Sequence, residues 1–142
     1  YDPKGVIAQM IEVYDKYKCS IVAIQEVPLN ETYKYGIIAG NLIDGSKDTY
    51  LVSNMVEKPS EKNAPSNMAI IGRYILTPDI FDILKSIPIG DGGEIQITDA
   101  LLEQAKQGKV IAYKFKGTRF DCGSVKGHIQ ATNHYAKILK II

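Results

Sequence analysis

The sequence predicts an α/β protein with a mixed sheet, and three observations lead to this class. Residues 6–17 and 126–142 carry apolar side chains at helical spacing. Short aliphatic runs such as residues 20–27 and 68–76 are typical of buried strands. Asp44-Gly45 lies between two further apolar runs and indicates a hairpin. No internal boundary is visible, so we expect residues 1–142 to form part of one domain.

The N-terminal part predicts a helix followed by a buried strand. Asp2 and Pro3 suit the N-cap and first turn of the helix over residues 6–17. Residues 20–27 follow as the strand. A helix that leads into a buried strand is half of a βαβ unit, so we expect a strand before Tyr1. The helix's apolar stripe consists of Val6, Ile7, Met10, Ile11, Tyr14 and Tyr17.

Three strands are expected in the middle of the chain. Residues 35–39 and 49–57 flank the hairpin signal, and residues 68–76 follow a polar loop at 60–67. Gly72 interrupts the last of these strands, which suggests a β-bulge or a close approach of another group.

Two short helices follow. Thr77 is expected to cap the first, with Pro78 at its first position. Thr98 or Asp99 is expected to cap the second, which Gly108 ends.

The C-terminal part predicts a strand at residues 110–116, in which Tyr113 and Phe115 share a face with Ile111. A short extended piece ends at residues 120–123. The helix over residues 126–142 then has a stripe formed by Ala131, Tyr135, Ile138, Leu139 and Ile142.

Composition narrows the possible functions. The net charge is +1 and the basic residues are scattered, so neither nucleic acid nor a membrane surface is an expected partner. No apolar run is long enough to cross a bilayer. Two distant cysteines form neither a disulfide framework nor a CxxC metal pattern, which favours a cytoplasmic location. The chain opens without Met and goes straight into an amphipathic segment, so we expect a cut inside a larger protein.

The first candidate site is Glu57-Lys58, where an apolar strand ends before Pro59. In an extended segment the two side chains would point to opposite faces. One could then bind a sugar hydroxyl, and the lysine ammonium could bind a phosphate. The alternative is an exposed ion pair of little energetic value.

Further candidates are less specific. Gly36 could let a ligand lie against the backbone, or could be a turn glycine. Asp121 could bind Mg²⁺, but one carboxylate is not a complete site, and spacing alone favours a turn or cap residue. Cys122 is expected to be a buried structural thiol. Glu94 and Asp99 suit the start of a helix, and His128 and His134 lack a third ligand nearby in sequence. Neither GxGxxG nor GxxxxGK[ST] occurs.

Several ordered motifs resemble the C-terminal half of bacterial-type UTP–glucose-1-phosphate uridylyltransferases, the UDP-glucose pyrophosphorylases. The resemblance covers nearly the whole chain. It is densest at Tyr35-Gly36-Ile37-Ile38, Val56-Glu57-Lys58-Pro59, residues 64–74, Gly93-Glu94-Ile95-Gln96-Ile97-Thr98-Asp99-Ala100 and Asp121-Cys122-Gly123.

The resemblance implies a Rossmann-like nucleotidyltransferase fold that lacks its N-terminal, nucleotide-binding half. The substrates would be UTP and glucose 1-phosphate, and the products UDP-glucose and pyrophosphate, with Mg²⁺ as cofactor. Gly36 and the Ile70 backbone would contact the sugar, Glu57 would hold its hydroxyls, and Lys58 would bind its phosphate. Asp121 would be a Mg²⁺ ligand, so Lys58 and Asp121 are the catalytic candidates.

We expect the parent protein to be a homo-oligomer and the 142 residues to be inactive alone. A related thymidylyltransferase, a non-catalytic sugar-phosphate-binding module and a structural interaction domain are the alternative functions. Cys122 and the run at residues 93–100 look most like the UTP enzymes.

Overall fold

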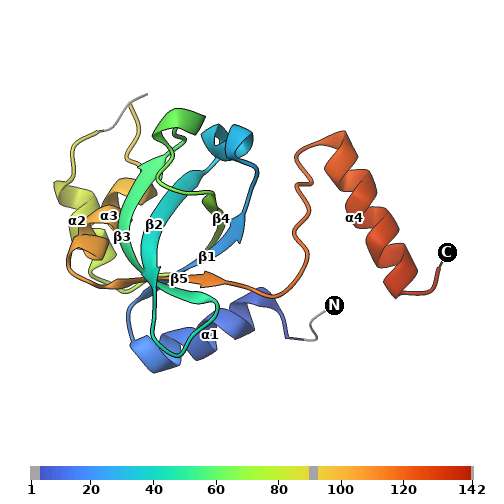
Figure 1. The fold of residues 1–142 in the computed structure, drawn as a ribbon, viewed down its shortest axis with the longest axis horizontal. Coiled ribbons are helices and arrows are strands. Elements are labelled where there is room, and N and C mark those ends of the chain that lie inside the picture. Colours follow the sequence, from blue (N-terminus) through green and yellow to red (C-terminus); the bar gives the residue numbers. More distant parts are fainter. Residues whose placement is uncertain (1–3, 90–92, 142) are drawn as a thin grey trace.

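The computed structural model describes residues 4–89 and 93–141, and within them five strands close into a barrel in the order β1-β4-β2-β3-β5 (Figure 1). The strands are β1 (Ser20–Glu26), β2 (Gly36–Leu42), β3 (Thr49–Glu57), β4 (Met68–Ile75) and β5 (Val110–Lys114). The helices are α1 (Val6–Tyr17), α2 (Ile80–Ser86), α3 (Ile97–Lys106) and α4 (Val125–Ile138), with short 3₁₀ turns at Leu29–Lys34 and Glu61–Asn63.

The sheet is mixed, as predicted. Strand β1 runs parallel to β5, whereas its pairing with β4 and the three remaining pairings are antiparallel. The β1–β4 register shifts between Val22 and Ile24, opposite the segment that holds Gly72 with φ +73°. The predicted bulge in β4 is therefore confirmed.

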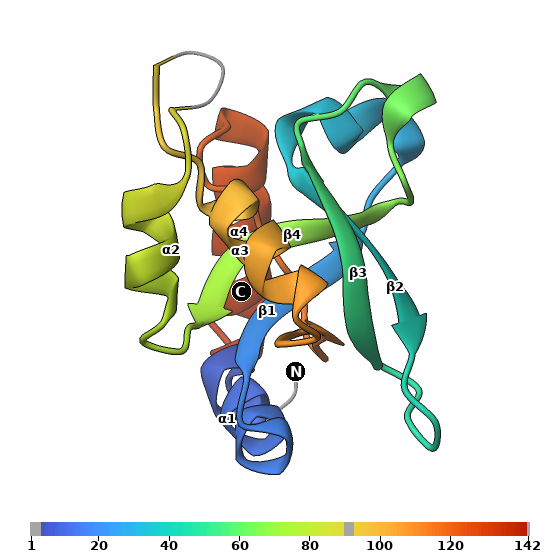
Figure 2. The same ribbon diagram turned by 90° about the vertical axis from the view of Figure 1, so that its left-hand side faces the viewer.

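The apolar run in β1 is continuous because both faces of the strand are covered. Val22 and Ile24 pack with residues of α2 and α3, including Ile80 and Leu101. Ile21 and Ala23 pack on the opposite face, in the cluster that α1 covers. Figure 2 shows α1 on one side of the barrel and α2 with α3 on another. The second cluster contains Met10, Ile111, Tyr113 and Phe115, so the predicted shared face of β5 is confirmed.

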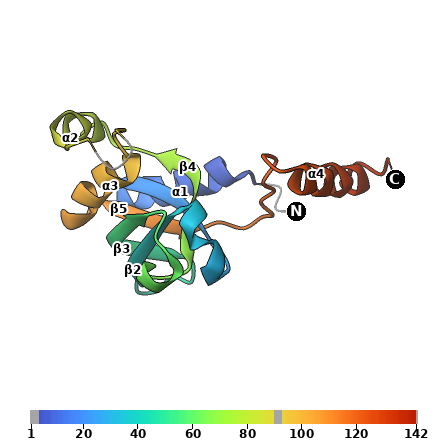
Figure 3. The ribbon, with the colours of Figure 1, turned by 90° about the horizontal axis from the view of Figure 1, so that it is seen from above.

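The last helix stands apart from the barrel (Figures 1 and 3). Its N-terminus is capped by Ser124, whose hydroxyl accepts a hydrogen bond from the Gly127 N–H. Tyr135 and Leu139 belong to the predicted apolar stripe, yet they are 52% and 65% exposed. The predicted helix is confirmed over Val125–Ile138, short of its expected end, and Ile142 lies outside the described residues. The exposed stripe residues do not pack on the barrel.

The predicted starts of three helices were wrong or lie outside the described residues. Helix α2 begins at Ile80, not at Pro78, and its N-cap is Asp79, so Thr77 is not the cap; the Thr77 hydroxyl is hydrogen-bonded to Ser20 and Gln104. Helix α3 begins at Ile97, before both predicted caps. The proposed cap of α1 at Asp2 and Pro3 lies outside the described residues; the helix starts at Val6 after Gly5.

The expected extended piece that ends at residues 120–123 is not a strand: residues 118–121 have no regular structure, and Cys122 and Gly123 form a turn. Among the described helices, none is long and apolar enough to span a membrane.

Candidate functional site

A cavity of about 260 Å³ opens where β2 begins and β3 ends, beside β4 and the first turn of α3. Three of the five residues to which the resemblance assigns a role border it, namely Gly36, Glu57 and Ile70. Its other lining residues include Tyr35, Tyr74, Thr98 and Arg119. The fold therefore brings together side chains that are far apart in the sequence.

Strand pairing places Gly36 directly across from Glu57. The two residues are partners in the antiparallel β2–β3 ladder, and the Lys58 N–H extends it by donating to the Tyr35 carbonyl oxygen at 3.0 Å. Gly36 is buried, and a Cβ there would lie 3.0 Å from Glu57 Oε2 and 3.2 Å from Thr98 Oγ1. A glycine suits position 36 because a side chain there would occupy the space that the Glu57 carboxylate and the Thr98 hydroxyl need.

Thr98 makes a hydrogen bond that local sequence reasoning missed. Its hydroxyl donates to Glu57 Oε2 at 2.5 Å, and the residue is 3% exposed. The sequence favoured Thr98 or Asp99 as the cap of α3, but the N-cap is Gln96 and no side chain bonds there. Only the proximity of α3 to β3 shows that the hydroxyl belongs to the site.

Lys58 does not follow the strand geometry assumed from the sequence. Strand β3 ends at Glu57, and Lys58 has φ +45°, in the left-handed region. The expectation that Glu57 and Lys58 point to opposite faces of an extended segment was therefore wrong. Both border a neighbouring cavity of about 410 Å³, together with Gln96 and Asp99.

An arginine connects this region to the loop that holds Asp121. Arg119 Nη1 donates to the Tyr35 hydroxyl at 3.1 Å, and its guanidinium lies over the same ring at 5.0 Å from the centroid. Arg119 also borders a third cavity, of about 380 Å³, which Asp121 and Arg73 line. A cation is thus available between the Glu57 cavity and the Asp121 loop.

The surroundings of Tyr74 in the site change the pKa of its hydroxyl. Burial raises the pKa of its hydroxyl, and the nearby Glu57 carboxylate raises that pKa further. The phenol therefore stays protonated beside a cavity that already holds a carboxylate.

Asp121 lies outside the Glu57 cavity, on the exposed loop before α4. Its Oδ1 accepts a hydrogen bond from the Gly123 N–H at 3.1 Å, the turn geometry that spacing had favoured. Within residues 4–89 and 93–141, no three His, Cys, Asp or Glu side chains gather where they could hold a metal ion. One carboxylate is not a complete magnesium site, and the part of the chain that the structure describes gathers no further ligands around Asp121.

The remaining candidates do not join the site. Cys122 is exposed, so the expected burial of its thiol was wrong; its loop precedes a helix that stands away from the barrel. Glu94 and His128 are exposed, whereas the His134 ring packs 5.0 Å from Phe120.

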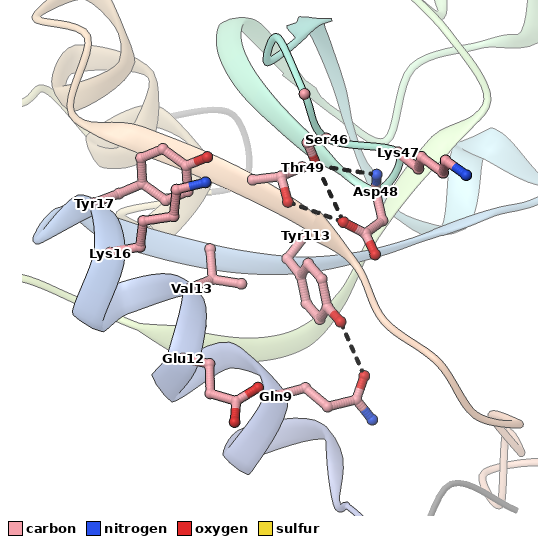
Figure 4. A pocket seen from close by; sticks show the side chains of 11 residues that line it. Gln9, Glu12, Val13, Lys16, Tyr17, Ser46, Lys47, Asp48, Thr49 and Tyr113 are labelled. Atoms are coloured by element: carbon pink, nitrogen blue, oxygen red, sulfur yellow. Dashed lines mark hydrogen bonds between the residues drawn. The ribbon is translucent and has the colours of Figure 1, made fainter.

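Another cavity, of about 420 Å³, lies between α1 and the β2–β3 turn (Figure 4). Its polar groups bond to one another: Tyr113 donates to Gln9 at 3.2 Å, and Thr49 donates to Asp48 at 3.1 Å. It contains none of the sequence-derived candidates, so the cavity at Glu57 is the stronger candidate site.

Comparison with known proteins identifies the class. The Nucleotidyl transferase family matches residues 4–138, and the chain belongs to that family. It is 62% identical over 129 residues to a UTP–glucose-1-phosphate uridylyltransferase of Pseudomonas aeruginosa PAO1, which covers 91% of this chain and 46% of the relative. A Staphylococcus epidermidis RP62A protein of the same name is 44% identical over 130 residues, covering 92% of this chain and 44% of the relative.

A solved structure of UDP-glucose pyrophosphorylase in complex with UDP-glucose matches with a TM-score of 0.89 and 55% identity, over 96% of this chain and 51% of that one. The resemblance inferred from the motifs is therefore confirmed. The chain spans about half the length of the curated relatives it matches.

Proposed function

We propose that the protein containing this chain transfers the uridylyl group of UTP to glucose 1-phosphate, and that these residues form the sugar-phosphate side of its site. The observation that carries the proposal is the Glu57 carboxylate, held against Gly36 and hydrogen-bonded to Thr98 at the wall of a sugar-sized cavity. The likeness to relatives named for this reaction supports it.

The cavity suits a hexose because it combines a carboxylate with neutral donors. The hydrogen bond found for the Glu57 carboxylate among the described residues is the one from Thr98 to Oε2, which leaves Oε1 to accept from sugar hydroxyls. Ile70 and Tyr74 supply apolar surface for a sugar ring. The sugar phosphate would then point toward Lys58 or Arg119, whose positive charges suit its oxygens.

In the proposed reaction an oxygen of the sugar phosphate attacks the α-phosphorus of UTP. A new phosphorus–oxygen bond forms, and the bond from the α-phosphorus to the oxygen that bridges to the β-phosphate breaks. That electron pair leaves with pyrophosphate. Lys58 would hold the attacking phosphate in place and offset negative charge in the transition state.

Asp121 is proposed as one ligand of Mg²⁺, which when bound would neutralise charge on the phosphate oxygens. Its other ligands would have to come from phosphates, water or parts of the protein outside these residues. A cytoplasmic location and a homo-oligomeric assembly stay predictions.

The test is pyrophosphate release by the full-length protein with glucose 1-phosphate and Mg²⁺, with UTP compared with dTTP. We expect release that prefers UTP, and a loss of about 100-fold or more in kcat/KM for glucose 1-phosphate in Glu57→Gln, because a charged acceptor oxygen is replaced with a neutral amide. A dTTP preference would assign the protein to the thymidylyl branch. No release with either nucleotide would contradict the enzyme assignment. The 142 residues alone are expected to release none.

A further inference from the structure

We propose that Thr98 is a positioning residue that orients the Glu57 carboxylate toward the sugar. The proposal deepens the proposed function and rests on it. The resemblance includes Thr98 in a matching motif but assigns it no role, and its local sequence context suggested only a helix cap.

The contact has the geometry of a strong hydrogen bond. The Thr98 hydroxyl lies 2.5 Å from Glu57 Oε2, in the range of hydroxyl–carboxylate bonds, and Thr98 is 3% exposed. The two residues are 41 positions apart in the sequence. The bond therefore fastens the first turn of α3 to the last residue of β3.

The bond also decides which carboxylate oxygen is available. A hydroxyl has one proton to donate, and Thr98 directs it to Oε2. Gly36 and Ile70 lie close on the same side, because a Cβ at Gly36 would meet Oε2 at 3.0 Å and Ile70 Cδ1 at 3.4 Å. The carboxylate is thus held on one edge, while Oε1 is left for the ligand.

A purely structural role for Thr98 is less consistent with the geometry. No side chain caps α3: the N-cap is Gln96, and the Asp99 N–H bonds to the Gln96 carbonyl oxygen. Removing the Thr98 hydroxyl consequently removes no helix cap. It leaves Glu57 Oε2 in a part-buried position without its donor, so the side chain is free to turn toward another partner.

The experiment uses Thr98→Val, which keeps the side-chain shape, and Thr98→Ser, which keeps the hydroxyl, in the full-length protein. Thr49→Val is the matched control. Thr49 is also buried, at 5% exposure, and donates to a carboxylate, that of Asp48, in the other cavity (Figure 4).

We expect Thr98→Val to raise the KM for glucose 1-phosphate about tenfold while the KM for UTP changes by less than about twofold. Thr98→Ser should restore most of the affinity, and Thr49→Val should resemble the wild type. A general loss of structure would move both KM values, so equal increases would overturn the proposal, as would an unchanged KM for glucose 1-phosphate.

A double-mutant cycle tests whether Thr98 acts through the Glu57 carboxylate. If Thr98 acts by orienting that carboxylate, Thr98→Val adds little to the defect of Glu57→Gln; additive effects would overturn the proposal. Wild-type protein that releases no pyrophosphate would refute the proposed reaction instead. The same Thr98 variants are then compared by calorimetric titration with glucose 1-phosphate, where equal affinity in Thr98→Val and wild type would overturn the positioning role.

Discussion

Replacing Gly36 with alanine should destabilise the chain through crowding alone. The backbone at Gly36 lies outside the left-handed region, so an alanine meets no dihedral strain there. Its Cβ would instead lie 3.0 Å from Glu57 Oε2, 3.2 Å from Thr98 Oγ1 and 3.4 Å from Ile70 Cδ1. The first two contacts press on the two partners of one short hydrogen bond, so neither can yield without disturbing the other.

Two opposing effects set the size of the change. Overpacking a buried site costs about 1–3 kcal/mol. Replacing glycine with alanine at a compatible backbone position stabilises by about 0.4–1 kcal/mol, because it restricts the unfolded chain. The difference is a net loss of at most about 2.6 kcal/mol, with a centre near 1.3 kcal/mol.

Gly5→Ala is the control without crowding. Gly5 has φ −58° and nothing within 4 Å of an added Cβ, and as the N-cap of α1 it loses only some capping preference when it becomes alanine. Gly40→Ala extends the series, because its Cβ would lie 2.5 Å from the Leu51 carbonyl oxygen, and backbone yields less readily than side chains. We therefore expect stability to fall in the order Gly5→Ala, Gly36→Ala, Gly40→Ala.

Urea unfolding of the chain followed by circular dichroism measures these differences, provided that the m-values agree among the variants. We expect Gly36→Ala to be about 1.3 kcal/mol less stable than the wild type, and less stable than Gly5→Ala. Equal stability of these two variants would refute the reasoning, since it would mean that Glu57 and Thr98 do not occupy the space that a Cβ at Gly36 needs.

Two other predictions concern the Asp121 loop and the pH response of the site. In Gly127→Ala the new Cβ would overlap the Asp121 carbonyl oxygen. We therefore expect α4 to lose protection from hydrogen exchange, although alanine ordinarily stabilises a helix by roughly 1 kcal/mol. Greater protection of α4 in the variant would contradict the close approach of Gly127 to Asp121. Tyr74 should ionise at a higher pH than an ordinary tyrosine, as measured by the tyrosinate absorbance that Tyr74→Phe removes, because burial and then Glu57 raise its pKa. The stability that this raised pKa contributes is present below the ordinary tyrosine pKa and is lost as pH rises through the folded-state value. An ordinary midpoint for the absorbance that Tyr74→Phe removes would contradict the prediction.

Patterns over a few neighbouring residues predicted most of the elements. The helical spacing in residues 6–17 corresponds to α1, and the apolar run at 20–27 corresponds to β1, because burial of one helix face or of both strand faces leaves a local pattern. The bulge at Gly72 was visible for the same reason, since a glycine inside an aliphatic run has a local conformational cause.

Helix starts and side-chain environments were less predictable because they depend on partners distant in sequence. Thr77 was expected to cap α2, but Ser20 and Gln104 hold its hydroxyl. Cys122 was expected to be buried, but its loop leads away from the barrel. In both cases the residue type allowed two environments, and packing selected one.

The candidate site, too, could be predicted only in part from the sequence. The sequence by itself determined the family and pointed to Gly36, Glu57 and Ile70, because the motifs around them are ordered and specific. Only the tertiary structure decided that Lys58 bends out of the strand and that Asp121 lies on a separate loop. It alone placed Thr98 on the Glu57 carboxylate, since a hydroxyl's choice between a helix end and a distant acceptor is settled by which one the fold brings within hydrogen-bonding distance.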